Sequence, residues 1–163
     1  MISPANAQIT FRQACARYAT GITISTAIAS DGTPHGFTAN SFTSVSLEPP
    51  LVLICIDRKA NIIDLFRTAK YFGINVLEAS QQELSNRFAG RGQDRFESVN
   101  WNPGSHGVPL LEGALAHFEC RLENVIEAGD HDIFIGEVLR SEFSDGDPLL
   151  YFKSRYGEIS SAE

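Results

Sequence analysis

The pattern of apolar and polar residues along the chain predicts mainly β-strands. Residues 22–29 begin with alternating isoleucine and hydroxyl side chains, which is the two-residue period of a half-buried strand. Residues 30–33 read Ser-Asp-Gly-Thr, a turn sequence that we expect to fold this strand back on residues 34–38 as a hairpin. The first sheet contacts are thus expected between neighbours in the sequence.

The same pattern returns later in the chain. Further strands are expected at residues 51–57, 71–77, 115–125, 132–143 and 149–153. Turn sequences, Ala-Gly-Asp at residues 128–130 and Asp-Gly-Asp-Pro at residues 145–148, separate the last three of these strands. A meander of long strands favours a closed antiparallel barrel, so the predicted fold class is mainly β with a few flanking helices.

Three short segments carry the helical period instead. Apolar residues of segment 9–19 fall on one helical face, and we expect this stripe to contact the core. Asn61 is a suitable cap for a helix that ends near residue 68. Residues 81–88 form a third helix with one apolar edge.

Residues 89–109 show neither the strand period nor the helix period, because glycine, asparagine and proline recur through them. A loop of this length inside a compact domain is more often functional than idle. With Arg91, Arg95 and Trp101 it is a candidate for governing ligand choice, and a contact between subunits is the alternative.

Residues 36–59, GFTANSFTSVSLEPPLVLICIDRK, join a polar arm to an apolar strand that ends in Asp-Arg-Lys. Hydroxyl and amide groups beside apolar walls suit a flat ligand with a polar edge, such as the isoalloxazine ring of a flavin. The prolines at positions 49 and 50 fix an extended corner before the strand. From this local chemistry alone, an edge strand with a polar turn is the competing interpretation.

Composition limits the remaining possibilities. With 163 residues, 43% of them hydrophobic, the chain suits one globular domain over residues 1–163, with a core at about 9–157 and a frayed tail at 158–163. No apolar run approaches the ~20 residues that span a bilayer, and the N-terminus lacks a basic-then-apolar signal. We therefore expect a cytoplasmic protein that is not inserted in a membrane.

The net charge and the positions of the cysteines and histidines argue against further kinds of partner and site. A formal net charge of -7 argues against nucleic acid or an anionic membrane as the main partner. The 3 cysteines are widely spaced without a CxxC pair, which predicts reduced core thiols. The 4 histidines form no ligand cluster, so no metal site is expected.

Four ordered segments resemble the short-chain flavin reductases, the reductase components of two-component flavin-dependent monooxygenases. They are residues 36–59 quoted above, FRQACARYATGITIST at 11–26, GDHDIFIGEV at 129–138 and PLLYFKSRYG at 148–157. Shorter matches, INVL at 74–77 and LSNRFAG at 84–90, extend the resemblance over nearly the whole chain. The resemblance implies an FMN-binding split β-barrel and a homodimer with the site near the interface.

The resemblance also assigns roles to residues. The flavin ring and ribityl chain are expected at Thr38, Ala39, Asn40, Ser41, Ser46 and Leu47. The phosphate end is expected at Cys55, Asp57, Lys59, Phe88, Ala89 and Arg91. His131 is placed next to the nicotinamide as the one catalytic candidate. Tyr156, near the C-terminus, is expected to cover the dinucleotide with its aromatic ring. Many relatives carry serine soon after the basic pair, whereas this chain has Ala60 and Asn61, so Asn61 becomes a substitute phosphate contact.

The implied activity is hydride transfer from NADH or NADPH to FMN or FAD, with reduced flavin supplied to a separate monooxygenase. Such chemistry needs two stacked rings and no nucleophile or carboxylate pair. The chain also lacks a GxGxxG after a strand, so the nicotinamide cofactor is not expected on a Rossmann domain. Two alternatives are a flavin-binding split barrel without turnover, like the pyridoxamine-phosphate-oxidase relatives, and a non-enzymatic β-barrel interaction module.

Overall fold

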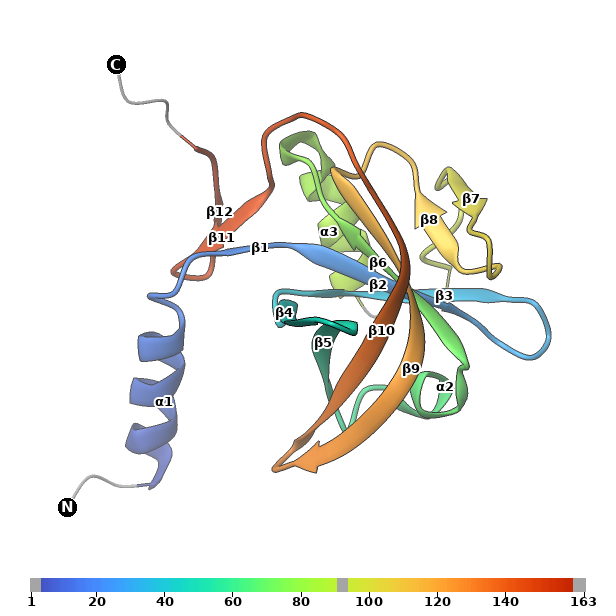
Figure 1. Cartoon of the computed structure of the whole chain (residues 1–163). Coiled ribbons are helices and arrows are strands. Elements are labelled where there is room, and N and C mark those ends of the chain that lie inside the picture. The colour runs from blue at the N-terminus through green and yellow to red at the C-terminus, as the bar shows by residue number, and fades with distance from the viewer. Residues whose placement is uncertain (1–3, 91–93, 160–163) are drawn as a thin grey trace.

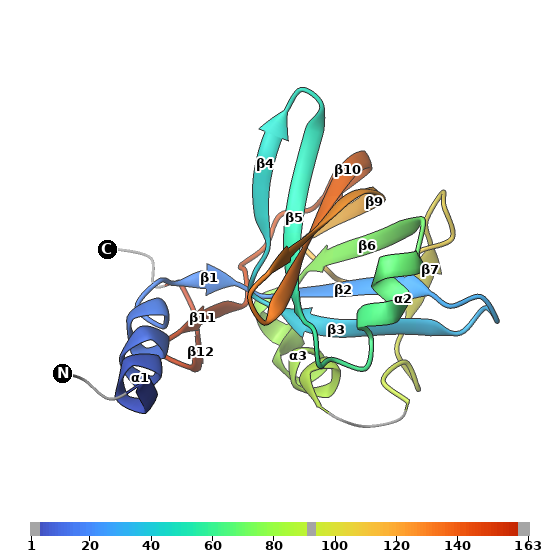
Figure 2. The same ribbon diagram turned by 90° about the horizontal axis from the view of Figure 1, so that it is seen from below.

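A computed structural model describes residues 4–90 and 94–159 of the chain. Its centre is a curled antiparallel sheet of seven strands in the order β3-β2-β6-β9-β10-β5-β4 (Figure 1). The strands are β2 (Thr23–Ile28), β3 (Pro34–Ala39), β4 (Thr43–Leu47), β5 (Pro50–Asp57), β6 (Tyr71–Val76), β9 (Ala116–Ala128) and β10 (His131–Phe143). The β4–β5 hairpin projects away from the rest of the sheet (Figure 2).

Smaller elements surround this sheet. The helical elements are α1 (Pro4–Cys15), α2 (Ile63–Thr68), η1 (Ala79–Gln81) and α3 (Gln82–Ala89). A three-stranded sheet of order β1-β11-β12 is built from β1 (Thr20–Gly21), β11 (Leu150–Phe152) and β12 (Arg155–Gly157). A two-stranded sheet pairs β7 (Trp101–Pro103) with β8 (Pro109–Leu111). None of the helices in the described part of the chain is long and apolar enough to cross a bilayer.

The predicted split barrel is confirmed, but the expected full closure of its strand ladder is not observed. The ladder runs from β3 to β4 and ends there, so these two strands are its edges. Other groups occupy the outward side of β3: Thr38 Oγ1 donates to Ser85 O at 2.7 Å, and Arg95 Nη1 donates to Gly36 O at 2.7 Å. These contacts come from α3 and the segment after it, and no strand among the described residues pairs with β3 on this side.

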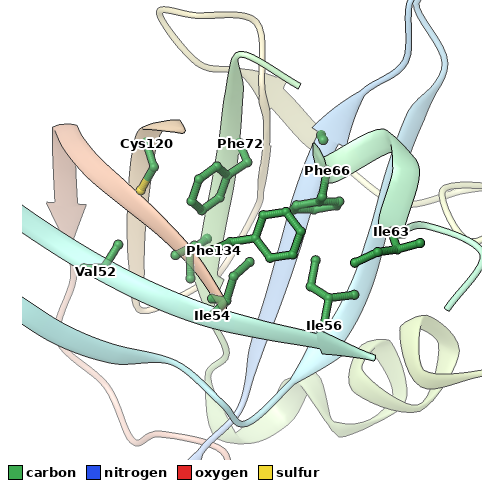
Figure 3. Packing of buried hydrophobic residues seen from close by; sticks show 10 residues of the cluster. Val52, Ile54, Ile56, Ile63, Phe66, Phe72, Cys120 and Phe134 are labelled. Carbon is green, nitrogen blue, oxygen red and sulfur yellow. The ribbon is translucent and has the colours of Figure 1, made fainter. Parts of the chain in front are cut away.

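Phenylalanine packing holds α2 against the sheet. Phe66 of α2 is 1% exposed and meets Phe37 of β3 at 5.3 Å and Phe134 of β10 at 6.2 Å between ring centroids. Both contacts are edge-on, the favourable geometry for aromatic pairs. The surrounding cluster includes Ile54 and Phe72 from β5 and β6 (Figure 3). This core fixes α2, and with it the turn that precedes α2.

The first helix differs from its prediction. Helix α1 spans Pro4–Cys15 in place of residues 9–19, and its apolar residues Ile9 and Phe11 are 55% and 69% exposed. The expectation that this stripe contacts the core is therefore wrong for the single chain. The reason is spatial: α1 stands apart from the seven-stranded sheet, next to the small sheet of β1, β11 and β12 (Figure 1).

Two further predictions need correction. Helix α2 does end at Thr68, but its N-cap is Ile62, whose side chain makes no capping bond, so Asn61 is not the cap. The segment 89–109 was expected to be irregular throughout, yet Trp101–Pro103 pairs with Pro109–Leu111. The hairpins predicted around residues 30–33 and 128–130 are confirmed by the pairing of β2 with β3 and of β9 with β10.

Candidate functional site

A cavity of about 1340 Å³ lies along the edge strand β3. Its walls come from β3, the end of β5, the turn at residues 59–62, the end of α3 and the segment 94–97. Eleven residues expected from the sequence line it together: Thr38, Ala39, Asn40, Ser41, Cys55, Asp57, Lys59, Asn61, Phe88, Ala89 and His131. The fold thus gathers segments that are far apart in the sequence around one cavity.

Hydrogen bonds within the polar arm fix one end of the cavity. Ser41 Oγ accepts the Cys55 N–H at 3.0 Å and donates to Cys55 O at 3.2 Å, which ties the arm to β5. The hydroxyl protons of Thr38 and Ser41 are therefore already donated to the protein. The amide of Asn40 is exposed and makes no hydrogen bond to other described residues, so it is available to a ligand. Burial raises the pKa of the Cys55 thiol, which keeps it protonated.

The turn after β5 presents one unpaired cation. Asp57 Oδ1 accepts the Lys59 N–H at 2.8 Å, and Arg58 N–H donates to Asp130 O at 3.0 Å. Within the described ranges no carboxylate lies within ion-pair distance of the Lys59 ammonium, which lines the cavity. The backbone of the turn is thus fixed while its lysine charge is left for a ligand.

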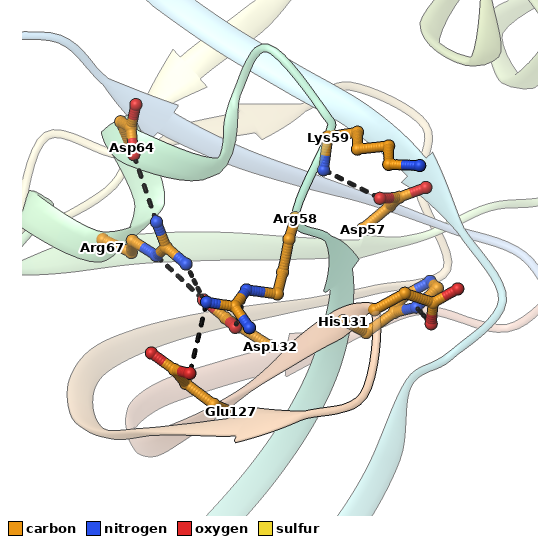
Figure 4. Close-up of polar contacts among 9 residues, drawn as sticks. Asp57, Arg58, Lys59, Asp64, Arg67, Glu127, His131 and Asp132 are labelled. Carbon is orange, nitrogen blue, oxygen red and sulfur yellow. Dashed lines mark hydrogen bonds and ion pairs between the residues drawn. The ribbon is translucent and has the colours of Figure 1, made fainter.

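An ion cluster lies behind this turn (Figure 4). Asp132 of β10 has a fully buried side chain, and its Oδ2 accepts bonds from Arg67 Nη2 at 2.6 Å and Nε at 2.8 Å. Its Oδ1 faces Arg58 Nε at 3.5 Å, an ion pair without a hydrogen bond, and Arg58 Nη2 reaches Glu127 at 3.2 Å. The hydrogen bond to Asp132 raises the pKa of Arg67. Both arginine charges are therefore compensated, unlike that of Lys59.

His131 enters the cavity from the start of β10. Its Nδ1 lies 2.7 Å from Asp130 Oδ1. This hydrogen bond lowers the pKa of Asp130, and the charge of the ring contributes less in the same direction. In register, His131 pairs with Asp57 across β10 and β5, so it is next to the turn that carries Lys59. With Nδ1 engaged by the carboxylate, Nε2 is the ring nitrogen free for a ligand.

Three expected residues do not line the cavity, and a fourth is not among the described residues. Ser46 and Leu47 are on the projecting β4 strand and do not line the cavity, and Leu47 is 93% exposed. Tyr156 is outside the cavity lining, and its hydroxyl donates to Asn86 Oδ1 at 2.9 Å on α3. Arg91 lies outside the described residues.

The structure places Arg95 and Trp101, which the sequence named only as candidates for governing ligand choice, in the cavity lining and adds Phe96 to them. Arg95 donates to Gly36 O of β3, and Phe96 packs against Phe88 and Trp101. The sequence signal was a basic residue next to an aromatic one inside a long loop. Asp132 was missed as well, and its signal was an acid within the apolar strand that follows His131.

Comparison with known proteins shows what the chain is similar to. The family model described as "Flavin reductase like domain" matches residues 15–160. The FMN reductase (NADH) SmoA of Agrobacterium fabrum is 44% identical over 150 residues, covering 92% of this chain and 85% of the relative. The reductase subunit HsaB of a flavin-dependent monooxygenase of Rhodococcus jostii is 40% identical over 150 residues, covering 91% of this chain and 76% of the relative.

A solved structure agrees over nearly the full length. The NADH:FAD oxidoreductase SgcE6 of Streptomyces globisporus, in complex with NAD and FAD fragments, matches with a TM-score of 0.91 at 37% identity, covering 98% of this chain and 96% of that one. Some relatives are longer. The chain spans 47% of a Rhizobium meliloti relative to which it is 45% identical over 145 residues.

The buried ion cluster yields a stability prediction. Replacing Asp132 with Asn removes the charge that compensates Arg58 and Arg67, and we expect the free energy of unfolding to fall by about 2 kcal/mol, less than for a fully buried pair because both arginines reach solvent. Urea denaturation measures the change. Asp64→Asn is the matched control, since its carboxylate also contacts Arg67 but is 88% exposed. Equal losses in the two variants would contradict the assignment.

Proposed function

We propose that this chain, which belongs to the flavin reductase like domain family, reduces FMN or FAD with NADH or NADPH as the hydride donor. The observation that carries the proposal is the cavity beside β3, which combines the Asn40 amide and the Lys59 ammonium, both without a partner among the described residues, with the Nε2 of His131. A family member named as an NADH-dependent FAD reductase and another named as an FMN reductase (NADH) support it.

The residues present suit a flavin. Asn40 is available to the polar edge of a ring, Ile56 and Phe88 offer apolar walls, and Lys59 offers a charge for a phosphate. A bound flavin supplies the ring that accepts the hydride. Cys55 stays a thiol, so the site provides no strong nucleophile there and instead provides orientation.

His131 is proposed to act on the nicotinamide side. Its Nε2 can orient the carboxamide or exchange a proton, while Asp130 holds the ring through Nδ1 at 2.7 Å. Asp132, in turn, positions the strand end and the Lys59 turn through Arg58. The two sides of the cavity thus carry separate tasks, phosphate binding and nicotinamide orientation.

Reduced flavin is proposed to leave the site for a separate monooxygenase. Relatives named as reductase components of a 4-nitrophenol 4-monooxygenase and of a trigonelline monooxygenase support this role. The cavity's opening along an edge strand is compatible with exchange of the flavin as a substrate.

The decisive experiment is to mix purified protein with FMN, FAD or riboflavin, add NADH or NADPH, and follow the loss of nicotinamide absorbance. We expect the protein to oxidise the nicotinamide cofactor, in the presence of flavin, much faster than flavin does without the protein. Flavin binding without turnover would support the binding-only split barrel instead. Absence of both binding and turnover would overturn the flavin proposal altogether.

His131→Ala should reduce kcat/KM for the nicotinamide substrate by about tenfold or more, since an orienting group is lost. The flavin Kd should change less, because Lys59 and Asn40 remain. Steady-state kinetics and flavin titration measure the two effects. Asp130→Asn keeps the imidazole and should give a smaller loss. A larger change in flavin Kd than in kcat/KM would remove His131 from the nicotinamide side.

A homodimer is proposed from exposed apolar residues. Ile9 and Phe11 on α1 and Val45 and Leu47 on β4 are each at least 47% exposed, on elements that project from the sheet. Exposed apolar surface of this kind marks association sites. In a dimer the projecting hairpin with Ser46 and Leu47 would be covered by the second copy.

Light scattering should give twice the 17.9 kDa chain mass for the unmodified protein. Phe11→Asp should shift the distribution toward monomer, because a buried charge in an apolar contact is costly. Gln8→Asp adds the same charge to an exposed polar position of α1 and serves as the control. Monomeric unmodified protein at micromolar concentration would refute the dimer.

A further inference from the structure

The β7–β8 hairpin lies outside the strand ladder of the seven-stranded sheet (Figure 1). Its two strands pair with each other, and within residues 4–90 and 94–159 no backbone hydrogen bond joins Trp101–Pro103 or Pro109–Leu111 to a strand of that sheet. Side chains of the sheet make the polar connections instead. The place of the hairpin relative to the sheet therefore depends on those side chains.

Asn75 of β6, in the INVL segment, connects β8 to the sheet. Its side chain is 0% exposed. Asn75 Oδ1 accepts the Leu111 N–H at 2.8 Å, and Nδ2 donates to Ile24 O of β2 at 3.0 Å. The same Nδ2 lies 3.5 Å from Pro109 O. One buried amide thus joins three strands, β2, β6 and β8.

The bond to Leu111 has no ready substitute. The N–H groups of successive strand residues point in alternate directions, and the Glu112 N–H donates to Asn100 O at 3.1 Å. The Leu111 N–H therefore faces the sheet and not β7. Leu111 is 0% exposed, so water does not replace a lost partner, and a buried N–H left unpaired is costly.

Three other side chains hold different groups of the hairpin. Thr26 Oγ1 donates to Pro109 O at 2.7 Å, and His117 Nε2 lies 2.8 Å from Leu111 O. The carboxylate of Glu119 accepts the His106 N–H at 3.1 Å in the turn between the two strands. Among the described side chains, Asn75 alone accepts a hydrogen bond from a backbone N–H of β8.

Leu111 connects this anchor to the cavity wall. It is the residue that pairs with Trp101 across the hairpin, and Trp101 lines the cavity. The Trp101 ring meets Phe96 at 6.2 Å, and Phe96 meets Phe88 at 5.0 Å between centroids. Leu111 and the three aromatic side chains belong to one apolar cluster. Because such clusters are closely packed, a shift of β8 displaces the aromatic part of the wall.

We propose that Asn75 is a positioning residue of the cavity. Its amide holds Leu111, and through the Leu111–Trp101 pair it fixes the aromatic wall against which the ligand packs. Asn75 itself does not line the cavity, so it acts only through the hairpin. The inference rests on the proposed function, since the ligand is the flavin of that proposal. Flavin binding and the order of the hairpin are then coupled, and each favours the other.

Asn75→Leu keeps the approximate size of the side chain and removes both hydrogen bonds. We expect the flavin Kd to rise about fivefold or more, and kcat at saturating substrates to stay within about twofold, because His131 keeps its contacts. Trp101 is the only tryptophan of the chain, so its fluorescence reports on the hairpin. Without ligand, acrylamide should quench it more strongly in Asn75→Leu than in the unmodified protein.

Val52→Ala is the matched control for a general loss of stability. Val52 is 4% exposed in the core on β5, outside the cavity lining and away from the hairpin. It should lower the midpoint of urea denaturation while leaving the flavin Kd within about twofold and the quenching of Trp101 unchanged. The positioning role is wrong if both variants raise the flavin Kd equally, or if Asn75→Leu changes neither the Kd nor the quenching.

Hydrogen exchange of the unmodified protein tests the coupling even where Asn75→Leu does not fold. Saturating flavin should slow exchange of the Leu111 amide as well as that of Ile54 in the core. Slowing at Ile54 but not at Leu111 would show that the hairpin opens independently of the ligand and would overturn the inference. No slowing at either residue with FMN or FAD would instead refute the flavin proposal, and Trp101 quenching in Asn75→Leu would still decide whether Asn75 holds the wall.

Discussion

A buried carboxylate at the start of β10 holds together the segments that shape the site. Asp132 is inaccessible to solvent, and its two oxygens face Arg67 of α2 and Arg58 of the turn after β5. A buried charge is tolerated only when it is compensated, so this carboxylate requires both arginines to stay in place. Their backbones carry the Lys59 turn and α2, and His131 precedes the carboxylate directly. The geometry of one wall therefore follows from one electrostatic constraint.

The same constraint separates structural from functional charges. Arg58 and Arg67 are neutralised by Asp132 and Glu127, whereas Lys59 and Arg95 line the cavity without an ion-paired carboxylate in the described part of the chain. On an acidic protein of net charge -7, uncompensated cations in a cavity are conspicuous. They indicate where a negatively charged ligand lowers the electrostatic free energy most.

Local patterns predicted the strands and hairpins well, because alternation and turn residues are properties of neighbours in the sequence. The face of α1 was mispredicted, since an apolar stripe shows that something covers a helix but not whether the same chain does. Arg95 was predicted only as part of a loop that is a candidate for governing ligand choice, because its partner Gly36 is 59 residues away in the sequence. Ser46 comes shortly after Ser41 in the sequence, yet the β4 strand carries it away from the cavity. These differences arise because the spacing of residues along the sequence does not say in which direction a helix face, a side chain or a strand points.

The open edge at β3 has a consequence for the chain's behaviour in a crowded solution. An edge strand with free carbonyls is a template on which other chains can add strands and aggregate. Here the carbonyl of Gly36 accepts from Arg95, and α3 covers the neighbouring stretch through Thr38. A side chain can cap such an edge while leaving space beside it, which a paired strand cannot do. At Gly36 the edge carbonyl is thus occupied by a side chain of the same protein, while the cavity beside it stays open to small molecules.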